Sequence, residues 1–238
     1  MTIPFASYIH EYHHRIDTAE ITVGKWILTL YKLVVSQLVN GEIFYDAKEA
    51  NRAIDFIENF CRHSKGRNDL LKLELWQKAA VSLIFGIMDE EGNRLYREVF
   101  MVVGRKNGKS LFAAAIIAYM AFLDGEYGAE IYCLAPKLAQ AGVVFNAFHQ
   151  MVKNEPEMNA LARKRRSDIY LECVNTIIMA LAFNAKKSDG LNPHLTVCDE
   201  IASWPAAQGL KQYEVIKSAF GSRRQPLLFS ISTAGYIN

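Results

Sequence analysis

Val103-Gly-Arg-Lys-Asn-Gly-Lys-Ser110 is the stretch around which the chain is arranged, and apolar segments flank it on both sides. The preceding segment, 97–103, predicts a buried strand, and the following segment, 111–123, predicts a buried helix. A glycine-containing turn that joins a strand to a helix aims backbone N–H groups and the positive end of the helix dipole at one point. The stretch therefore predicts a phosphate-binding loop.

The side chains of this loop suit a nucleoside triphosphate. Lys109 supplies a positive charge for the β and γ phosphates, and the Ser110 hydroxyl can ligate Mg²⁺. One departure from the pattern G-x-x-x-x-G-K-[ST] is that Val103 stands where the first glycine is expected. A surface turn is the alternative, which the flanking strand and helix disfavour. The other predicted nucleotide contacts are Gly104, Arg105, Lys106, Asn107 and Gly108.

An acidic segment downstream supports a nucleotide site. The segment 195–200, Leu-Thr-Val-Cys-Asp-Glu, is typical of a buried strand that ends in two carboxylates. Ligands of a parallel sheet bind at the carboxyl ends of its strands. We expect Asp199 to hold Mg²⁺ together with Ser110, and Glu200 to polarise the attacking water. Because neighbouring residues on a strand face opposite ways, the strand must end at Asp199 for both carboxylates to serve.

The order of the predicted elements indicates the fold class. Strands that alternate with helices predict an α/β fold, with a mainly parallel central sheet flanked by helices. The last strand ends in Ser232-Thr233-Ala234-Gly235, where the Thr233 hydroxyl either senses the γ phosphate or belongs to a plain turn. Beyond the loop, we expect strands at 129–135, 169–174, 176–183, 195–200 and 226–231, and helices at 137–153 and 206–220.

The N-terminal part of the chain is predicted to be helical, as a region over residues 1–68 that precedes a nucleotide-binding domain over residues 69–238. Asp46 and Glu49 form a potential capping box at the start of the third helix. Apolar residues recur at helical spacing in 5–16, 24–39 and 46–64.

A helix predicted at 73–87 opens the nucleotide-binding domain. It carries Gln77, whose side chain has one acceptor and two donors. Gln77 is therefore either a surface amide or a partner for the N6 and N7 edge of adenine.

A zinc-protease pattern occurs near the N-terminus, where His10-Glu11-Tyr12-His13-His14 satisfies H-E-x-x-H. Two histidines one helical turn apart can hold zinc, but the site needs a third ligand. No matched third ligand follows, which favours an ordinary solvated helix.

Bulk composition sets wide limits. A chain of 238 residues, 51% hydrophobic, can bury a substantial core. Its net charge of +2 argues neither for nor against nucleic acid. No signal peptide or membrane-spanning run is apparent, so we expect a soluble, intracellular protein without a membrane partner. The four cysteines have no metal-ligand spacing, and we expect buried reduced thiols at Cys61, Cys133, Cys173 and Cys198.

Two short segments concentrate positive charge. One is 62–67, Arg-His-Ser-Lys-Gly-Arg, a predicted loop. The denser one is 163–166, Arg-Lys-Arg-Arg. A solvated face is the simplest interpretation, and contact with a phosphate backbone or with phosphates held by a neighbouring subunit is the alternative for the second segment.

At these motifs the chain resembles the ATPase domain of the large terminase subunit, the DNA-packaging motor of tailed bacteriophages. The resemblance covers about residues 70–238, and it accounts for Val103, because the loop of this family lacks the usual first glycine. The matching elements are Leu75-Trp76-Gln77 with the adenine motif, 103–110 with the deviant Walker A motif, 195–200 with Walker B, and 230–235 with the coupling motif.

The resemblance implies a P-loop ATPase fold of the additional-strand, catalytic-Glu type, with ATP and Mg²⁺ as ligands. It implies double-stranded DNA, a portal protein and a small terminase subunit as partners, in the host cytoplasm and transiently at the portal vertex. Family members form a ring, so we expect a homo-oligomer in the assembled motor and a monomer when isolated.

Two further implications concern residues and activities. The family uses an arginine that reaches the ATP of the neighbouring subunit, and Arg223 and Arg224 are our predicted catalytic arginines among the candidates Arg163, Arg165, Arg166, Arg223 and Arg224. Full-length members continue into a ribonuclease H-like nuclease, which these residues do not include, so we expect no DNA cleavage. A helicase-like DNA-dependent ATPase and a nucleotide-binding assembly module that is inactive without neighbouring subunits are the alternative functions.

Overall fold

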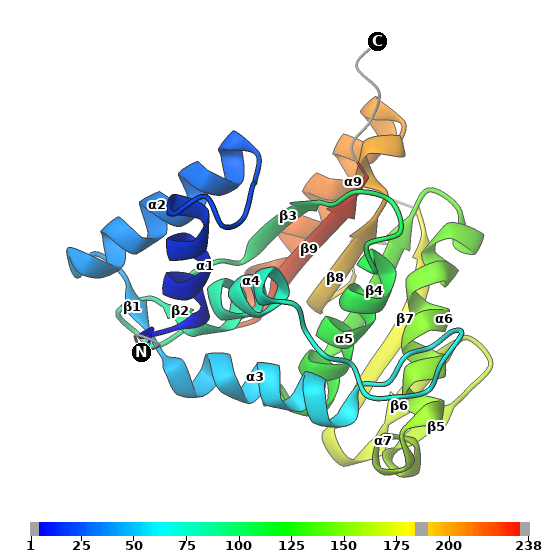
Figure 1. The fold of residues 1–238 in the computed structure, drawn as a ribbon. Helices are drawn as coiled ribbons and strands as arrows, with labels where there is room; N and C mark the ends of the chain where they lie inside the picture. The colour runs from blue at the N-terminus through cyan, green and yellow to red at the C-terminus, as the bar shows by residue number, and fades with distance from the viewer. Residues whose placement is uncertain (1–4, 184–189, 234–238) are drawn as a thin grey trace. The chain divides into compact units, whose positions relative to one another are not determined.

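The computed structural model describes residues 5–183 and 190–233 (Figure 1). The chain forms two compact units. The first comprises Met1–Glu58 and Lys72–Tyr96, and the second comprises Asn59–Leu71 and Arg97–Asn238. Because each unit takes two segments of the chain, the units interleave along the sequence, and the division predicted after residue 68 stays a prediction.

The first unit is mainly helical, as the apolar spacing predicts. Its helices and strands are α1 (Tyr8–Asp17), α2 (Lys25–Val39), α3 (Ala47–Phe60), α4 (Leu75–Gly86) and the antiparallel pair β1 (Phe44–Tyr45) and β2 (Ile87–Met88). Asp46 caps α3, since its Oδ1 accepts hydrogen bonds from the backbone N–H groups of Lys48 and Glu49. A core of buried apolar residues joins α1, α2 and α4, among them Ile9, Tyr31 and Leu83.

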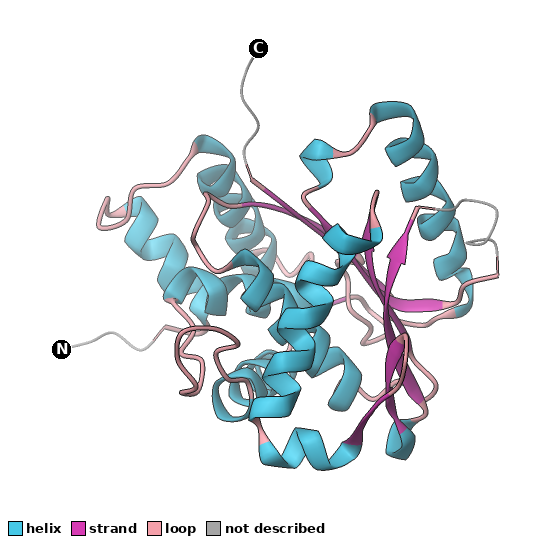
Figure 2. Ribbon diagram, turned by 90° about the vertical axis from the view of Figure 1, so that its right-hand side faces the viewer, coloured by secondary structure: helices cyan, strands magenta, loops and turns pink. Residues whose placement is uncertain are grey.

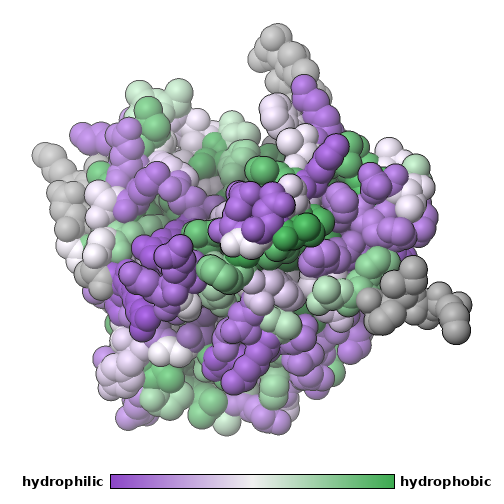
Figure 3. Space-filling view, turned by 90° about the vertical axis from the view of Figure 1, so that its left-hand side faces the viewer, coloured by the Kyte–Doolittle hydropathy of each residue, from purple (hydrophilic) through white to green (hydrophobic). Residues whose placement is uncertain are grey.

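Apolar side chains of the first unit are also exposed. Trp26 and Val39 on α2 are each 76% exposed. Hydrophobic surface is interspersed with hydrophilic surface on the face drawn in Figure 3. None of the helices in the described part of the chain is long and apolar enough to cross a membrane.

The second unit is built on a seven-stranded sheet of order β3-β9-β8-β4-β7-β6-β5. The first five strands pair in parallel and the last two antiparallel. β9 lies between β3 and β8, which is the arrangement of the additional-strand type. The strands are β3 (Glu98–Val102), β4 (Glu130–Ala135), β5 (Ala162–Lys164), β6 (Asp168–Leu171), β7 (Thr176–Ala182), β8 (Pro193–Asp199) and β9 (Leu227–Ser232).

Helices cover both faces of this sheet (Figure 2). Phe229 of β9 packs its ring against Phe112 of α5, whereas its neighbour Leu228 lies in a cluster with Ile216 of α9. Successive side chains of a strand point to opposite faces, so α5 and α9 lie on opposite sides. The helices are α5 (Lys109–Phe122), α6 (Leu138–Asn154), α7 (Pro156–Leu161) and α9 (Ala206–Ser218), with short 3₁₀ turns at Glu172–Val174, Ile201–Ser203 and Ala219–Ser222.

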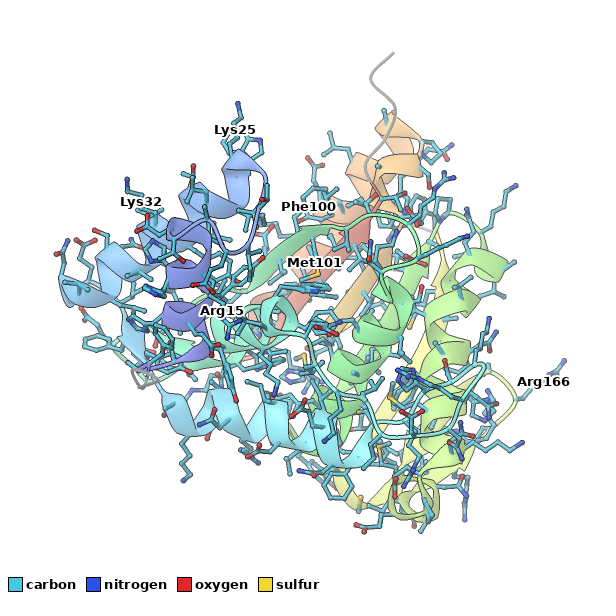
Figure 4. The ribbon with its side chains drawn as sticks, in the orientation of Figure 1. Arg15, Lys25, Lys32, Phe100, Met101 and Arg166 are labelled. Atoms are coloured by element: carbon cyan, nitrogen blue, oxygen red, sulfur yellow. The ribbon has the colours of Figure 1, made fainter. Side chains whose placement is uncertain are left out.

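The prediction that strand 97–103 is buried is wrong. β3 is an edge strand of the sheet, and Phe100 on it is 64% exposed. The labelled side chains of Phe100 and Met101 in Figure 4 belong to this strand. An edge strand has a neighbour on one side only, and apolar composition cannot distinguish it from a central strand such as β8, where every residue is buried.

Cysteine burial agrees with the prediction at three of four positions. Cys61, Cys133 and Cys198 are buried and free, and burial raises the pKa of the Cys198 thiol to about 12. Cys173 is free but exposed, because it lies in the short turn between β6 and β7 rather than in a strand. The prediction of a buried thiol there is wrong.

Candidate nucleotide-binding site

The glycine-containing loop joins β3 to α5 at the carboxyl edge of the parallel strands. Gly108 has φ +72° and is the N-cap of α5, and no side chain of the described residues caps this helix. The first N–H groups of an α-helix have no partner within the helix, so those of α5 remain available for an anion. Lys106 also has a positive φ of 66°, a conformation that is uncommon outside glycine.

Internal hydrogen bonds hold the loop in shape. The side-chain amide of Asn107 donates to the carbonyl oxygens of Gly104 and Arg105 at 3.2 and 3.4 Å. Val103 donates its backbone N–H to the Ser232 carbonyl oxygen at 3.0 Å. The residue that replaces the first glycine of the pattern therefore continues the pairing of β3 with β9.

Three predicted site residues meet at the ends of β8, β9 and the loop. Lys109 Nζ donates to Glu200 Oε1 at 2.8 Å. Glu200 Oε2 accepts from the backbone N–H of Thr233 at 3.0 Å and from its hydroxyl at 2.9 Å. Glu200 therefore bridges the loop lysine and the end of β9.

Burial differs between the two charges of this pair. The Lys109 side chain is 9% exposed and the Glu200 side chain 40%. Burial acts to raise the pKa of Glu200, but the hydrogen bonds from Lys109 and Thr233 outweigh it and hold that pKa below its usual value. Glu200 is therefore a carboxylate at neutral pH, and a ligand that competes for Lys109 would release it.

Asp199 is the last residue of β8 and is buried. Burial, followed by the negative charge of Glu200, raises the pKa of Asp199 to about 6. The Trp204 indole N–H donates to the Asp199 carbonyl oxygen at 2.9 Å and fixes the end of the strand. A buried carboxyl group with a raised pKa is a suitable ligand for a hard cation, because the bound cation would favour the charged form of the carboxyl group.

The turn after Asp199 brings the second carboxylate to the same edge. Glu200 has φ +48°, in the left-handed region, and a 3₁₀ turn follows at Ile201–Ser203. Ser203 returns two hydrogen bonds to the Glu200 carbonyl oxygen, from its N–H at 2.8 Å and from its hydroxyl at 2.7 Å. The strand thus ends at Asp199, as predicted, and the backbone turns at Glu200.

Comparison with known proteins agrees with this geometry. The family model described as "Terminase large subunit, ATPase domain" matches residues 75–238, more than half of the chain. The chain belongs to this family.

Relatives of this terminase ATPase domain come from several phages. The chain is 25% identical over 200 residues to the terminase large subunits of Lactococcus phage p2 and Lactococcus phage SK1, over 77% of this chain and 35% of each relative. The crystal structure of the HK97 bacteriophage large terminase is similar with a TM-score of 0.64 and 26% identity, over 77% of this chain and 37% of that chain. The chain therefore spans about a third of the length of these relatives.

Gln77 of the terminase ATPase domain lies in the first unit, at the N-terminus of α4. Its Oε1 accepts a 2.9 Å hydrogen bond from the Glu74 backbone N–H, and the two residues form a reciprocal capping box. The loop belongs to the second unit, so the adenine role of Gln77 stays a prediction. Ala234 and Gly235 of the predicted coupling motif lie outside the described residues.

The candidate arginines have different environments in the structure. The Arg223 side chain is 9% exposed and pairs with Glu126 at 2.7 Å. Its other nitrogens donate to the Gly128 carbonyl oxygen and to Asn192. All of these partners precede strands, at the end of the sheet opposite the loop. This anchoring is structural and argues against our prediction that Arg223 reaches a neighbour's nucleotide.

The remaining arginines are exposed. Arg165 pairs with Asp168 at 2.5 Å and lies over the Tyr170 ring. These two contacts already engage its guanidinium group. Arg166 projects away from the fold in Figure 4. Arg163, Arg166 and Arg224 stay candidates for an arginine that acts in trans.

The zinc pattern on α1 has other partners. The His10 ring shares a 2.8 Å hydrogen bond with Ser7, and the exposed His14 ring lies 5.2 Å from the Phe5 ring. Within the described residues, no group of three or more His, Cys, Asp or Glu side chains could hold a metal ion. The Mg²⁺ site predicted above differs, because it uses one carboxylate, one hydroxyl and phosphate oxygens.

Two residues hold the strand ends in ways that the motifs do not specify. The Ser232 hydroxyl accepts from the Ala202 N–H at 3.2 Å and ties β9 to the turn after Glu200. Trp204, which fixes the end of β8, belongs to no motif. These contacts join side chains to backbone groups that only the folded chain brings together, which a linear motif does not encode.

Proposed function

We propose that the chain hydrolyses ATP and that this hydrolysis drives double-stranded viral DNA into a procapsid. The observation that carries the proposal is the bridge from Lys109 through Glu200 to Thr233. It joins a phosphate-binding lysine, a general base and the end of a neighbouring strand in one hydrogen-bonded series. The family membership supports the same activity.

The donor set suits ATP with Mg²⁺. The uncapped N-terminus of α5 and the left-handed Gly108 leave backbone N–H groups open to phosphate oxygens. Ser110 in the first turn of α5 and the buried Asp199 would hold the cation, and bound Mg²⁺ would neutralise charge on the β and γ phosphates. The raised pKa of Asp199 fits this role, since a nearby cation stabilises its charged form.

Catalysis would begin with an exchange of partners. Lys109 would leave Glu200 for the phosphates, which carry more negative charge than one carboxylate. Glu200 would then be free to accept a proton from the attacking water, while Thr233 continues to orient it through Oε2. Loss of the γ phosphate would return Lys109 to Glu200, and each turnover would thereby be transmitted to the end of β9.

The motor itself requires partners. We infer a homo-oligomeric ring on the portal protein, with the small terminase subunit presenting the DNA, in the host cytoplasm. An arginine of one subunit would stabilise charge on the ATP of the next, which supports activity in the ring over activity in a monomer. Gln77 is the proposed adenine contact, and the loop residues Gly104, Arg105, Lys106 and Asn107 are the proposed phosphate contacts.

Phosphate release by the purified chain tests the enzymatic part of this proposal. Lys109→Ala should abolish turnover, because the phosphates lose their buried cation. Lys211→Ala, an exposed lysine on α9, is the matched control and should keep the wild-type rate. A Lys109→Ala protein with the wild-type rate would contradict the proposal.

A nucleotide-binding assembly module is the second candidate. The pairing of Lys109 with Glu200 favours this second candidate, because Lys109 occupies the carboxylate of the proposed base in the nucleotide-free chain. The rate per subunit measured against protein concentration distinguishes the two: a steep rise means a site shared between subunits, whereas no turnover at any concentration favours the module. A strand-displacement assay separates a packaging ATPase from a helicase, since only the helicase opens the duplex.

A further inference from the structure

Two basic segments that the nucleotide site does not use both pack against α6 in the second unit. The side-chain amide of Asn154, the last residue of α6, donates to the His63 carbonyl oxygen at 3.0 Å. Arg62 pairs with Glu155 at 2.7 Å. These contacts anchor the segment 62–67 against the C-terminal end of α6, 91 residues away along the chain. Figure 1 shows this loop beside α6.

The segment 163–166 reaches the same helix. Lys164 Nζ lies 4.7 Å from the centre of the Phe145 ring on α6. Burial lowers the pKa of His149, and the positive charges of Lys164 and Lys153 lower it further. Residues four apart on a helix share one face, so His149 lies beside Lys153 on α6, and Asn154, which contacts segment 62–67, follows five residues after His149.

Four side chains form what we call the basic corner: Lys65, Arg67, Lys153 and Lys164. All four residues are exposed. Among the described residues, no carboxylate pairs with the three lysines, and the pair of Arg67 with Asp69 at 3.3 Å is solvent-exposed, which makes it weak. The corner therefore carries positive charge that the fold does not neutralise.

We leave the other basic residues of the two segments out of the basic corner, because their side chains either have acidic partners or point elsewhere. Arg62 and Arg165 pair with Glu155 and Asp168. Arg163 lies on the other face of β5 from Lys164, because side chains alternate along a strand. Arg166 is exposed in the turn after β5 and projects away from the fold in Figure 4.

The spread of these charges selects the kind of ligand. They come from three elements, a loop, a helix end and an edge strand, so one triphosphate would not engage them together. Duplex DNA presents a phosphate about every 3.4 Å along each strand. This spacing is shorter than one turn of α6, about 5.4 Å, so one DNA strand can place several phosphates beside charges on different elements. We propose that the basic corner binds the phosphate backbone of duplex DNA. This inference rests on the proposed function and names the surface that contacts its DNA.

Salt dependence of DNA binding is the decisive measurement. The variant replaces all four corner residues: Lys65→Gln, Arg67→Gln, Lys153→Gln and Lys164→Gln. The control removes the same charge from exposed lysines elsewhere: Lys25→Gln, Lys32→Gln, Lys48→Gln and Lys211→Gln. Binding of a blunt duplex of random sequence is measured by fluorescence anisotropy over a range of salt concentrations.

The corner variant should bind DNA more weakly, and its plot of log affinity against log salt should be shallower by about 0.9 for each phosphate that it no longer neutralises. The control should keep the wild-type slope. Both proteins should keep the circular dichroism spectrum, melting temperature and ATPase rate of the wild type, because none of these residues belongs to the nucleotide site.

Three results would overturn the inference. Equal losses of affinity in both variants would mean that net charge alone attracts DNA. Unchanged DNA binding in the corner variant, with a loss of concentration-dependent ATPase activity, would assign the corner to a contact between subunits. A wild-type chain that hydrolyses ATP but binds no duplex would overturn the DNA part of the proposed function as well, whereas the first two results leave that function intact.

Discussion

Lys109 and Glu200 lie 91 residues apart in the sequence and form an ion pair of 2.8 Å at the end of the parallel sheet. The pair places the phosphate-binding cation and the catalytic carboxylate of the proposed reaction in direct contact. One of them must change partner before a nucleotide can be bound and hydrolysed.

Glu200→Gln should separate nucleotide binding from hydrolysis. Glutamine cannot accept the proton of the attacking water, and loss of a general base lowers turnover by roughly 10²- to 10⁴-fold. Binding should be retained, because Lys109 loses the carboxylate that competes with the phosphates. A fluorescent ATP analogue reports binding and phosphate release reports turnover. Glu214→Gln on α9 is the control, and normal hydrolysis by Glu200→Gln would remove Glu200 as the base.

Thr233→Val should shift the pH dependence of hydrolysis. The Thr233 hydroxyl donates to Glu200 and stabilises its charged form, so its removal raises the pKa of that carboxylate. The acid limb of the rate profile should move to higher pH by up to about one unit, since a hydrogen bond to a charged group is worth about 1.5 kcal/mol. Thr233→Ser keeps the hydroxyl and should keep the profile. An unchanged profile for Thr233→Val would show that this contact does not tune the base.

Asp199→Asn should stabilise the nucleotide-free chain at neutral pH while removing metal-dependent hydrolysis. Burial, followed by the charge of Glu200, raises the pKa of Asp199 from 3.8 to about 6. A carboxyl with a raised pKa binds more protons in the folded state, so its stabilising contribution is complete below about pH 4 and is lost as the pH rises through about 6. At neutral pH the buried charge costs about 1 to 3 kcal/mol, which asparagine avoids.

Urea unfolding of wild type and Asp199→Asn at two pH values measures this effect. The gain in the free energy of unfolding should be clearly larger at about pH 7.5 than at about pH 4, where the wild-type carboxyl is already protonated. Equal gains at both values would mean that the stabilisation comes from packing and not from the charge.

Arg223→Ala should destabilise the second unit. It removes four hydrogen bonds at the end of the sheet opposite the loop, one of which is the ion pair with Glu126. Breaking a fully buried ion pair costs about 3 to 5 kcal/mol, and the Glu126 side chain is 26% exposed, so we expect a loss toward the lower end of this range and a fall in melting temperature of about 6 to 12 °C. The exposed neighbour Arg224 is the control, and Arg224→Ala should melt like the wild type. An Arg223→Ala protein of normal stability that lost only concentration-dependent hydrolysis would restore Arg223 as the arginine in trans.

The sequence by itself predicted the loop, the acidic strand end and the α/β fold. The reason is that these features are local. A strand, a glycine-containing turn and a buried helix follow one another from Arg97 to Leu123, and the two carboxylates directly follow an apolar run. Strand and helix alternation then restricts the sheet to mainly parallel pairing, which brings Lys109 and Glu200 to one edge.

Tertiary structure decided what depends on segments far apart in the chain. Apolar composition placed β3 in the core, but the order of the strands makes it an edge, with Phe100 exposed. The family resemblance implied a catalytic role for Arg223 or Arg224, whereas Glu126 and Gly128 bind Arg223 at the end of the sheet opposite the loop. The partners of Glu200, and the contacts of segments 62–67 and 163–166 with α6, also arise from packing. Local periodicity and motifs report backbone preference, whereas the neighbour of a charged side chain is set by how distant segments fold together.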